Sequence, residues 1–307
     1  MKNVLDILSP EELLGYKLCA LYSTYGYGKY RMSKFEEYDL YVKNKEFLIS
    51  DNVITFTDTD GKLLALKPDV TLSIIKNSKD NANEALKVYY NENVYRVSKG
   101  THSFKEIRQA GLEYLGCVDN ETLVEVAFLA KKSLDEICTS NVLEISQLDL
   151  VKEILAYTSV SESGIEKIVT FLASKNTQGV AQVCEEEGVS EENAKLILKL
   201  VTTYGKAEKV TDKLNEFRVN EKTSKAVDDL VFVTRALEEK GVTVSIDFSI
   251  VSDMNYYNGL AFKGFVEGVP VSVLSGGQYD ALMKKMNKKA QAVGFAVYLD
   301  EIANVNA

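Results

Sequence analysis

Side chains alternate along residues 88–116 in a pattern that predicts two strands joined by a polar turn. The tip of this hairpin, residues 98–103, contains Lys, Gly, Thr and His, which is typical of a loop. On the second strand, Gln109 and Glu113 share one face and lie about 13 Å apart, at roughly 3.3 Å per residue. Arg96 stands on the first strand. This face is either a solvated hairpin surface or the lining of a polar pocket, and both interpretations remain open at this point.

Apolar residues at helical spacing predict most of the helices. Ser9, Pro10 and Glu12 form a helix start with a capping box, and further helices are expected at 120–137 and 148–157. A region rich in Glu and Lys has no recognisable cluster of reactive side chains. It predicts helical segments at 163–174, 177–187, 190–204, 206–217 and 222–240. The simplest interpretation of its charge is a solvated surface, and a partner-binding face is the alternative.

Turn residues indicate the other strands. An Asp-Gly pair at 60–61 predicts a hairpin over 53–66. Alternation at 243–251 predicts a strand, and a Glu-Gly turn predicts a hairpin over 260–274. A short strand is expected at 142–145. Strands and helices therefore mix along the chain in the manner of an α+β protein.

The segment from Lys67 to Thr71 leads from the first hairpin into an apolar helix. Pro68 biases Lys67 toward an extended backbone. Asp69 or Thr71 can cap the helix that follows, since both residue types are favoured at that position. Alternatively, the carboxylate and the hydroxyl point at the amine of a ligand. The local sequence is compatible with both interpretations.

The composition argues for a globular protein and against several kinds of site. The chain has 307 residues, 46% apolar and 26% charged, and its net charge of −9 argues against a dedicated nucleic-acid-binding protein. No apolar run approaches the roughly 20 residues of a membrane span, so we expect a cytoplasmic protein with no membrane partner. Four widely spaced cysteines suggest reduced thiols. The single histidine, His102, argues against a zinc site or a histidine relay, and we expect no metal and no cofactor.

Several motifs resemble those of one enzyme family. Residues 94–116, with Tyr-Arg, a loop and Gln-Ala-Gly-Leu-Glu-Tyr-Leu-Gly, resemble motif 2 of the class II aminoacyl-tRNA synthetases in its histidyl form. Residues 67–71 stand where the histidyl enzymes have Arg-Pro-Glu-Gly-Thr. Residues 256–259 resemble their second histidine-binding motif, 275–280 their Gly-Gly-Arg-Tyr-Asp turn, and 292–302 their motif 3. With aspartate at position 69, this motif resembles the form found in a noncatalytic branch of the family, the regulatory subunits of ATP phosphoribosyltransferase.

The matches follow the family's order and cover roughly residues 50–116 and 245–302. The resemblance implies an α+β fold with a class II synthetase-like core, a mostly antiparallel sheet flanked by helices. The Tyr-rich segment 30–42 stands where the family has the motif of its dimer interface. We expect a first part of the core, a helical insertion and a second part of the core at residues 1–158, 159–225 and 226–307. The chain ends at Ala307, so we expect no anticodon-binding domain.

The resemblance implies a histidine-binding site made of Asp69, Thr71, Arg96, Gln109, Glu113, Tyr256 and Tyr257. The α-amino group would be held by Asp69, Thr71 and Gln109, and the imidazole nitrogens by Glu113 and Tyr256. An ammonium needs oxygen acceptors, and an imidazole N–H needs a buried carboxylate, so these residue types suit those roles.

The departures from the family concern ATP. Arg96 keeps the motif 2 arginine, which would face the ligand carboxylate, but Ser98 stands where the enzymes have a glutamate. Ser252, Gln278 and Glu301 replace arginines. Amino-acid activation needs cations at the ATP phosphates, and Glu301 would repel them. We therefore expect no catalytic residues, no histidine activation and no charging of tRNA.

The resemblance then implies a noncatalytic regulatory subunit for the first step of histidine biosynthesis. Its expected partner is the short-form catalytic subunit of ATP phosphoribosyltransferase, with a homodimeric core, a hetero-octameric complex and L-histidine as ligand. Two alternatives remain. One is a divergent ligase that adenylates an amino acid. The other is a synthetase-like module that binds RNA or protein, although the net charge of −9 makes tRNA a poor partner.

Overall fold

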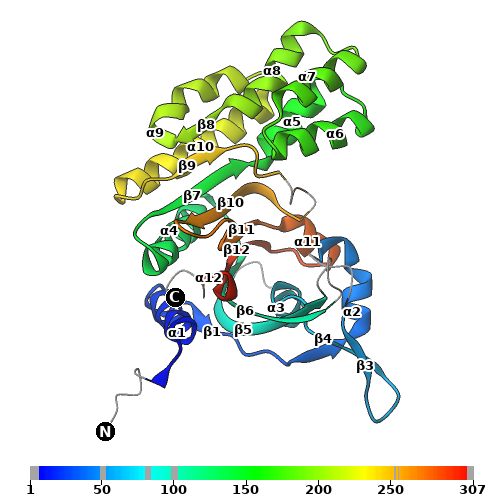
Figure 1. Cartoon of the computed structure of the whole chain (residues 1–307), viewed down its shortest axis with the longest axis vertical. Helices are drawn as coiled ribbons and strands as arrows, with labels where there is room; N and C mark the ends of the chain where they lie inside the picture. Colours follow the sequence, from blue (N-terminus) through cyan, green and yellow to red (C-terminus); the bar gives the residue numbers. More distant parts are fainter. Residues whose placement is uncertain are drawn as a thin grey trace.

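The computed structural model describes residues 7–48, 53–79, 84–97, 103–251, 254 and 256–302. Its centre is a nine-stranded sheet (Figure 1). The strands, in spatial order, are β1 (Gly28–Lys29), β5 (Leu86–Val97), β6 (Phe104–Gly116), β12 (Gln291–Tyr298), β11 (Leu274–Gln278), β10 (Asn258–Val266), β7 (Asn141–Gln147), β9 (Ser245–Asp247) and β8 (Tyr204–Lys206). Only the β1–β5 and β7–β9 pairs are parallel among these described strands. The predicted mostly antiparallel sheet is thus confirmed.

One face of this sheet is covered by long helices. They are α1 (Pro10–Thr24), α4 (Asn120–Ile137), α5 (Leu148–Tyr157) and α10 (Glu221–Glu239). The predicted start of α1 is confirmed, because the Glu12 amide donates to Ser9 Oγ over 3.3 Å and the Ser9 amide donates to Glu12 Oε2 over 2.9 Å. This capping box satisfies backbone donors that the first helical turn leaves unpaired. The helices bury the apolar side chains of the strands beneath them.

Among the described residues, the other face is covered at its β5–β6 end and around a cavity. A three-stranded sheet, a helix preceding β5 and a short helix after β11 lie there (Figure 1). These elements are β2 (Phe35–Glu37), β4 (Leu63–Leu66), β3 (Thr55–Thr57), α2 (Tyr38–Lys43), η2 (Lys45–Phe47), α3 (Thr71–Asn77) and α11 (Asp280–Lys285). The hairpin predicted around residues 60–61 is β3–β4, and Gly61 takes the positive φ of 81° that favours glycine. The uncovered part of this face becomes the site described below.

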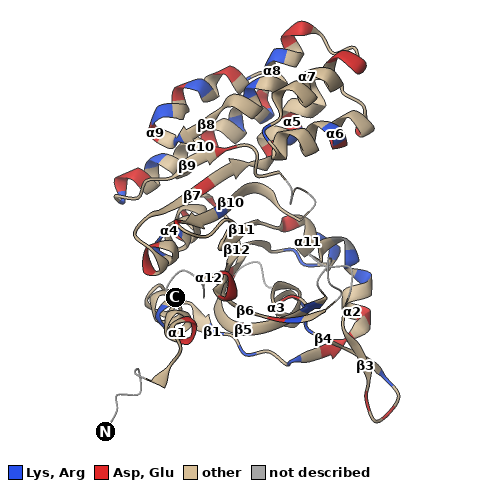
Figure 2. Cartoon of the chain, viewed as in Figure 1, with Lys and Arg blue, Asp and Glu red and all other residues tan. Residues whose placement is uncertain are grey.

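The helical region lies at one end of the molecule (Figure 1). It contains α6 (Glu162–Ala173), α7 (Thr177–Glu186), α8 (Glu191–Thr202), α9 (Ala207–Val210) and η3 (Thr211–Phe217). Acidic and basic residues are both spread over these helices and α10 (Figure 2), as the interpretation of a solvated surface predicts. Their apolar faces, including Ile168 and Ile197, join the same core as the central sheet.

One detail of the helical region corrects the sequence analysis, and a second concerns the predicted division of the chain. Residues 204–206, assigned to the ends of two helices, form strand β8, which pairs with β9 at the edge of the main sheet. Helix α10 also runs across the boundary predicted between residues 225 and 226. The apolar core is continuous there, so neither a linker nor a break in packing marks that limit. The division into three segments stays a prediction.

Two strands also differ from their predicted limits. The strand predicted over 243–251 is reduced to β9, Ser245–Asp247. The second strand of the hairpin predicted over 260–274 lies further along the chain. It is β11, which begins at Leu274 and continues through Gln278, across residues predicted to form a turn. A Cβ atom on Gly276 would lie 2.5 Å from the Gly294 carbonyl oxygen, and one on Gly277 would lie 2.7 Å from the Leu260 oxygen. These glycines therefore permit close strand contact rather than chain reversal.

Candidate ligand-binding site

Small side chains leave space on the uncovered face of the sheet. Glu113 pairs with Gly294, and Gly111 pairs with Ala296, in the register of β6 and β12. A Cβ atom on Gly294 would lie only 1.8 Å from Glu113 Oε2, so no larger residue fits beside that carboxylate. The resulting cavity has a volume of about 440 Å³. Alternation along the strands thus gives a floor of glycine, alanine and serine on this face.

All seven residues of the predicted histidine site line this cavity. Asp69 and Thr71 come from the start of α3, and Arg96 comes from β5. Gln109 and Glu113 come from β6, and their burial rejects the interpretation of a solvated hairpin, since they are 3% and 2% exposed. Tyr256 and Tyr257 precede β10 and pack edge to face, with ring centroids 4.7 Å apart. The structure therefore brings together residues that are separated by up to 188 positions in the chain, from 69 to 257.

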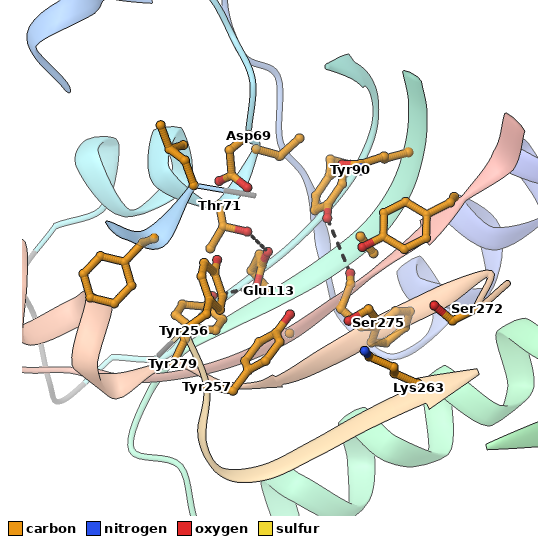
Figure 3. A pocket seen from close by; sticks show the side chains of 18 of the residues that line it. Asp69, Thr71, Tyr90, Glu113, Tyr256, Tyr257, Lys263, Ser272, Ser275 and Tyr279 are labelled. Atoms are coloured by element: carbon orange, nitrogen blue, oxygen red, sulfur yellow. Dashed lines mark hydrogen bonds between the residues drawn. The ribbon is translucent and has the colours of Figure 1, made fainter. Parts of the chain in front are cut away.

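Glu113 is the most deeply embedded acid of the site. Thr71 Oγ1 donates to Glu113 Oε1 over 2.7 Å, and the Tyr279 hydroxyl donates to Oε2 over 2.6 Å (Figure 3). Burial nevertheless raises the pKa of Glu113 to about 8, because desolvation outweighs the two donors and nearby Asp69 adds repulsion. Without a ligand, the Glu113 carboxyl is thus protonated at neutral pH. In that form the carboxyl offers a ligand one O–H donor and retains acceptor capacity.

Asp69 combines the two roles that its sequence left open. Its Oδ1 accepts a hydrogen bond from the Leu72 amide over 2.9 Å, so it caps the first turn of α3. It also lines the cavity and is 8% exposed. Burial raises the pKa of Asp69, and the Leu72 amide and the Arg96 charge act in the opposite direction. The cap holds the carboxylate in place for a cationic group.

Arg96 is half-buried, and part of its guanidinium is already engaged. Arg96 Nε donates to the Pro68 carbonyl oxygen over 2.9 Å, which ties β5 to the segment that carries Asp69. The arginine therefore positions the acidic side of the cavity as well as lining it. A charge-assisted hydrogen bond of this kind orders a ligand site before the ligand arrives.

The sequence analysis missed several residues that line the cavity. They are Phe47, Leu48, Val70, Tyr90, Lys263, Ser272, Ser275, Tyr279, Gly294, Phe295, Ala296 and Tyr298. Tyr279 lies in the Ser275–Asp280 motif, and the resemblance assigned it no role. Lys263 could have been found from alternation, because it is a charged residue inside an otherwise apolar strand. The aromatic residues Phe47 and Tyr279 flank Tyr256, with ring centroids 6.2 and 6.0 Å away.

The residues that replace the family's arginines lie apart from this cavity where the structure describes them. The Leu260 amide donates to Gln278 Oε1 over 2.9 Å, at a bulge where Gly259 has a φ of 57°. Gln278 thus satisfies a backbone donor that the bulge removes from the ladder. Glu301 is exposed on α12 (Leu299–Ile302). Ser98, His102 and Ser252 lie outside the described residues.

Other kinds of site find no support in the described part of the chain. No group of three or more His, Cys, Asp or Glu residues is arranged there to hold a metal ion. No helix within the described ranges has the length and apolar character needed to span a membrane. The four cysteines are free thiols.

The architecture, with its antiparallel sheet, flanking helices and cavity above β6, β12, β11 and β10, is that of the class II aminoacyl-tRNA synthetases. The family model described as histidyl-tRNA synthetase matches residues 9–302. The chain therefore belongs to the histidyl-tRNA synthetase family, and the fold class predicted from the motifs is confirmed.

Curated relatives carry another name within that family. A protein of Acetivibrio thermocellus named ATP phosphoribosyltransferase regulatory subunit is 28% identical over 98% of this chain and 74% of its own length. One of Clostridium novyi with the same name is 28% identical, over 93% of this chain and 70% of its own length. The resemblance to these subunits is confirmed at this level.

Solved structures support the same fold. A Bacillus halodurans protein described as an ATP phosphoribosyltransferase regulatory subunit/histidyl-tRNA synthetase has a TM-score of 0.85 and 23% identity, covering 99% of this chain and 84% of the other. A chain of the ATP phosphoribosyl transferase (HisG:HisZ) complex from Thermotoga maritima has a TM-score of 0.73 and 18% identity, covering 93% and 96%. At these identities the likeness concerns the fold alone.

Proposed function

We propose that this protein is a noncatalytic regulatory subunit of ATP phosphoribosyltransferase that binds L-histidine in a degenerate synthetase site. The observation that carries the proposal is the gathering of the seven predicted residues around one cavity. The names of the curated relatives support the same conclusion. The separate catalytic subunit joins ATP to phosphoribosyl pyrophosphate, and this chain gives it activity and sensitivity to histidine.

The cavity offers a partner for the amine and the imidazole of histidine. Asp69, Thr71 and Gln109 present oxygen acceptors to the α-amino group. Glu113 and Tyr256 bond the imidazole, which lies among aromatic rings that surround Tyr256. Because Glu113 is protonated at neutral pH when the site is empty, a neutral imidazole can share that proton with it. The complex then contains one proton between two groups of similar basicity.

The cations needed to activate an amino acid with ATP are largely missing. Glu301 and Gln278 replace arginines, and Gln278 serves a backbone bulge instead. Without cations at the phosphates, charge that develops during adenylation is not stabilised. The family description as a synthetase favours the alternative of a divergent amino-acid-adenylating enzyme, and Arg96 and Lys263 are the cavity cations it would use. Because the other cations are missing, the proposal assigns no catalytic residue and no cofactor.

Regulation requires histidine to bind the two states of the complex with different affinity. A ligand held in this chain inhibits the catalytic subunit only if its binding favours a less active arrangement of the two proteins. We propose a homodimeric core that assembles with catalytic subunits as a hetero-octamer. Since its proposed ligand comes from histidine biosynthesis, we also propose that the protein acts in the cytoplasm.

Reconstitution tests this function. Purified chain is added to a short-form catalytic subunit, and product formation from ATP and phosphoribosyl pyrophosphate is measured with and without L-histidine. The proposal predicts that activity depends on this chain and falls with histidine. The variant Glu113→Gln should still activate but should lose the inhibition, since the imidazole loses its ionisable partner.

Histidine-dependent exchange of pyrophosphate into ATP by the chain alone would favour the adenylating enzyme instead. Activation without inhibition in the wild-type complex would retain the subunit assignment and reject the histidine site. The matched control is Glu301→Gln, which removes an exposed carboxylate outside the cavity and should change neither readout.

A further inference from the structure

The cavity has a second end that the predicted histidine site does not include. Lys263 of β10, Ser275 of β11 and Ser272 of the preceding loop line it, and all three are half-buried. Figure 3 shows these residues across the cavity from Asp69 and Glu113. One end therefore contains carboxyl groups and the other contains an ammonium group and two hydroxyls.

Sheet register explains how Lys263 enters the cavity. Lys263 pairs with Ser275, Ser275 pairs with Ala296, and Ala296 pairs with Gly111. These positions form one row across four strands, and the row continues to Tyr90 on β5. Because the residues between Tyr90 and Lys263 are small, the long lysine side chain borders open space rather than packed core.

The separation of the two ends suits a single amino acid. Glu113 and Lys263 belong to β6 and β10, which are three strand spacings, or about 14 Å, apart. Both side chains line the cavity between these strands. A zwitterion with its cationic groups at the acids and its carboxylate at the lysine would fill the gap.

The charged surroundings of Lys263 are consistent with a cation at this end. On β7, Glu144 is its cross-strand neighbour, and the Lys263 charge acts to lower the pKa of Glu144, which burial and nearby Asp247 raise. Asp247 is itself paired with Lys175 over 2.5 Å. Lys263 thus has a carboxylate on the side away from the cavity and hydroxyls on the side toward it.

We infer that Lys263, assisted by Ser272 and Ser275, binds the α-carboxylate of the amino acid in this cavity. The inference rests on the proposed histidine site and assigns its carboxylate end to a residue that the family resemblance did not indicate. Arg96, which the resemblance assigned to the carboxylate, instead holds the Pro68 carbonyl and stabilises the charge of Asp69. Lys263 and Arg96 therefore have separable roles.

A ligand without a carboxylate distinguishes these roles. L-histidinol keeps the ammonium and the imidazole but has a hydroxymethyl group in place of the carboxylate. Both ligands are titrated by calorimetry into wild type and Lys263→Met. The variant should bind L-histidine roughly 10- to 100-fold more weakly than wild type does, as expected for loss of a hydrogen bond to a charged group. Binding of L-histidinol should change less than about twofold. Lys263→Arg should restore most of the L-histidine affinity, since it restores the charge.

Arg96→Met is the matched control and should weaken both ligands to a similar extent, because it acts through Asp69. If Lys263→Met weakens both ligands equally, Lys263 is only structural and the inference is wrong. If Arg96→Met weakens L-histidine alone, the carboxylate lies at Arg96 and the inference is also wrong, while the histidine site stands. If wild type binds neither ligand, the histidine site and this inference both fall. Lys263→Gln repeats the test should the methionine variant not fold.

Discussion

The two faces of the central sheet are built by the same strands but differ in chemistry. On β6, Ala110 and Leu112 face the helices and are fully buried. Gln109, Gly111 and Glu113 alternate with them and face the cavity. The same contrast continues on β12, where Val293 and Val297 face the helices and Gly294 and Ala296 face the cavity. On β11, Ser275 and Gly277 face the cavity. The helix face is packed with apolar side chains, whereas the cavity face contains open space and buried acidic side chains.

This difference teaches how to identify a site within a buried sheet. A packed face gains stability with each apolar side chain. A buried carboxyl such as Glu113 is unfavourable unless donors or a ligand compensate it, and its raised pKa reports that imbalance. Burial together with poor hydrophobicity therefore indicates function more strongly than either property alone.

Truncation on the helix face should have the largest effect on stability. Leu112→Ala should lower the free energy of unfolding by about 2–5 kcal/mol, because it removes a fully buried side chain and leaves a cavity. Gln109→Ala, on the cavity face, should lower it by less than about 1 kcal/mol, since its neighbour is already open space. Urea unfolding of both variants measures the difference. Equal losses would contradict the contrast between the faces.

Filling the floor of the cavity should remove binding while affecting stability less. Gly294→Ala places a Cβ 1.8 Å from Glu113 Oε2 and 2.5 Å from the Leu112 carbonyl oxygen. We expect a loss of about 1–3 kcal/mol from this overpacking and no measurable heat with L-histidine. Ala296→Gly, on the same strand and face, enlarges the cavity and should retain binding. A Gly294→Ala variant that binds normally would show that the ligand lies elsewhere.

The buried acid should make stability depend on pH. The ordinary pKa is 4.5 and the folded pKa of Glu113 is about 8, so between these values the folded protein binds a proton that the unfolded chain has lost. This contribution to stability is fully present below about pH 4.5 and is lost as the pH rises toward about 8. Asp69 and the hydroxyls of Thr71, Tyr279, Tyr256 and Tyr90 surround the carboxyl.

Melting temperatures between pH 5 and 9 measure this dependence in wild type and in Glu113→Gln. The glutamine variant is uncharged throughout and should become more stable relative to wild type as the pH increases. A difference that is constant across the range would mean that Glu113 is ionised in the folded protein at all these values.

The smallest effect is expected at the former arginine position on α12. Glu301 is exposed and outside the cavity, so Glu301→Arg should change stability by less than about 0.5 kcal/mol. It should also restore no ATP binding, because the other lost cations remain absent. Calorimetry with ATP checks the second point, and ATP binding by this variant would show that the charge of Glu301 alone had prevented it.

Local signals predicted much of this structure. Ser9 and Glu12 determine the start of α1 through neighbouring backbone groups, and alternation placed Gln109 and Glu113 on one face. Gly276 was assigned to a turn because only the distant Gly294 shows that it serves close strand contact. Lys263 carries a local signal, a charge within an apolar strand, but only the small residues of other strands show that it borders a cavity. Long-range register therefore limits sequence-based prediction of the site.

Calorimetric titration with L-histidine from pH 5.5 to 9, for wild type and Glu113→Gln, tests the central claim most directly. The complex holds one proton between Glu113 and the imidazole. Affinity should therefore be highest between the pKa of free imidazole, about 6.5, and that of Glu113 in the empty site, about 8. Glu113→Gln should bind more weakly and lose this optimum. Wild type that gives no heat with L-histidine, or a glutamine variant with an unchanged pH profile, would contradict a histidine site built on Glu113.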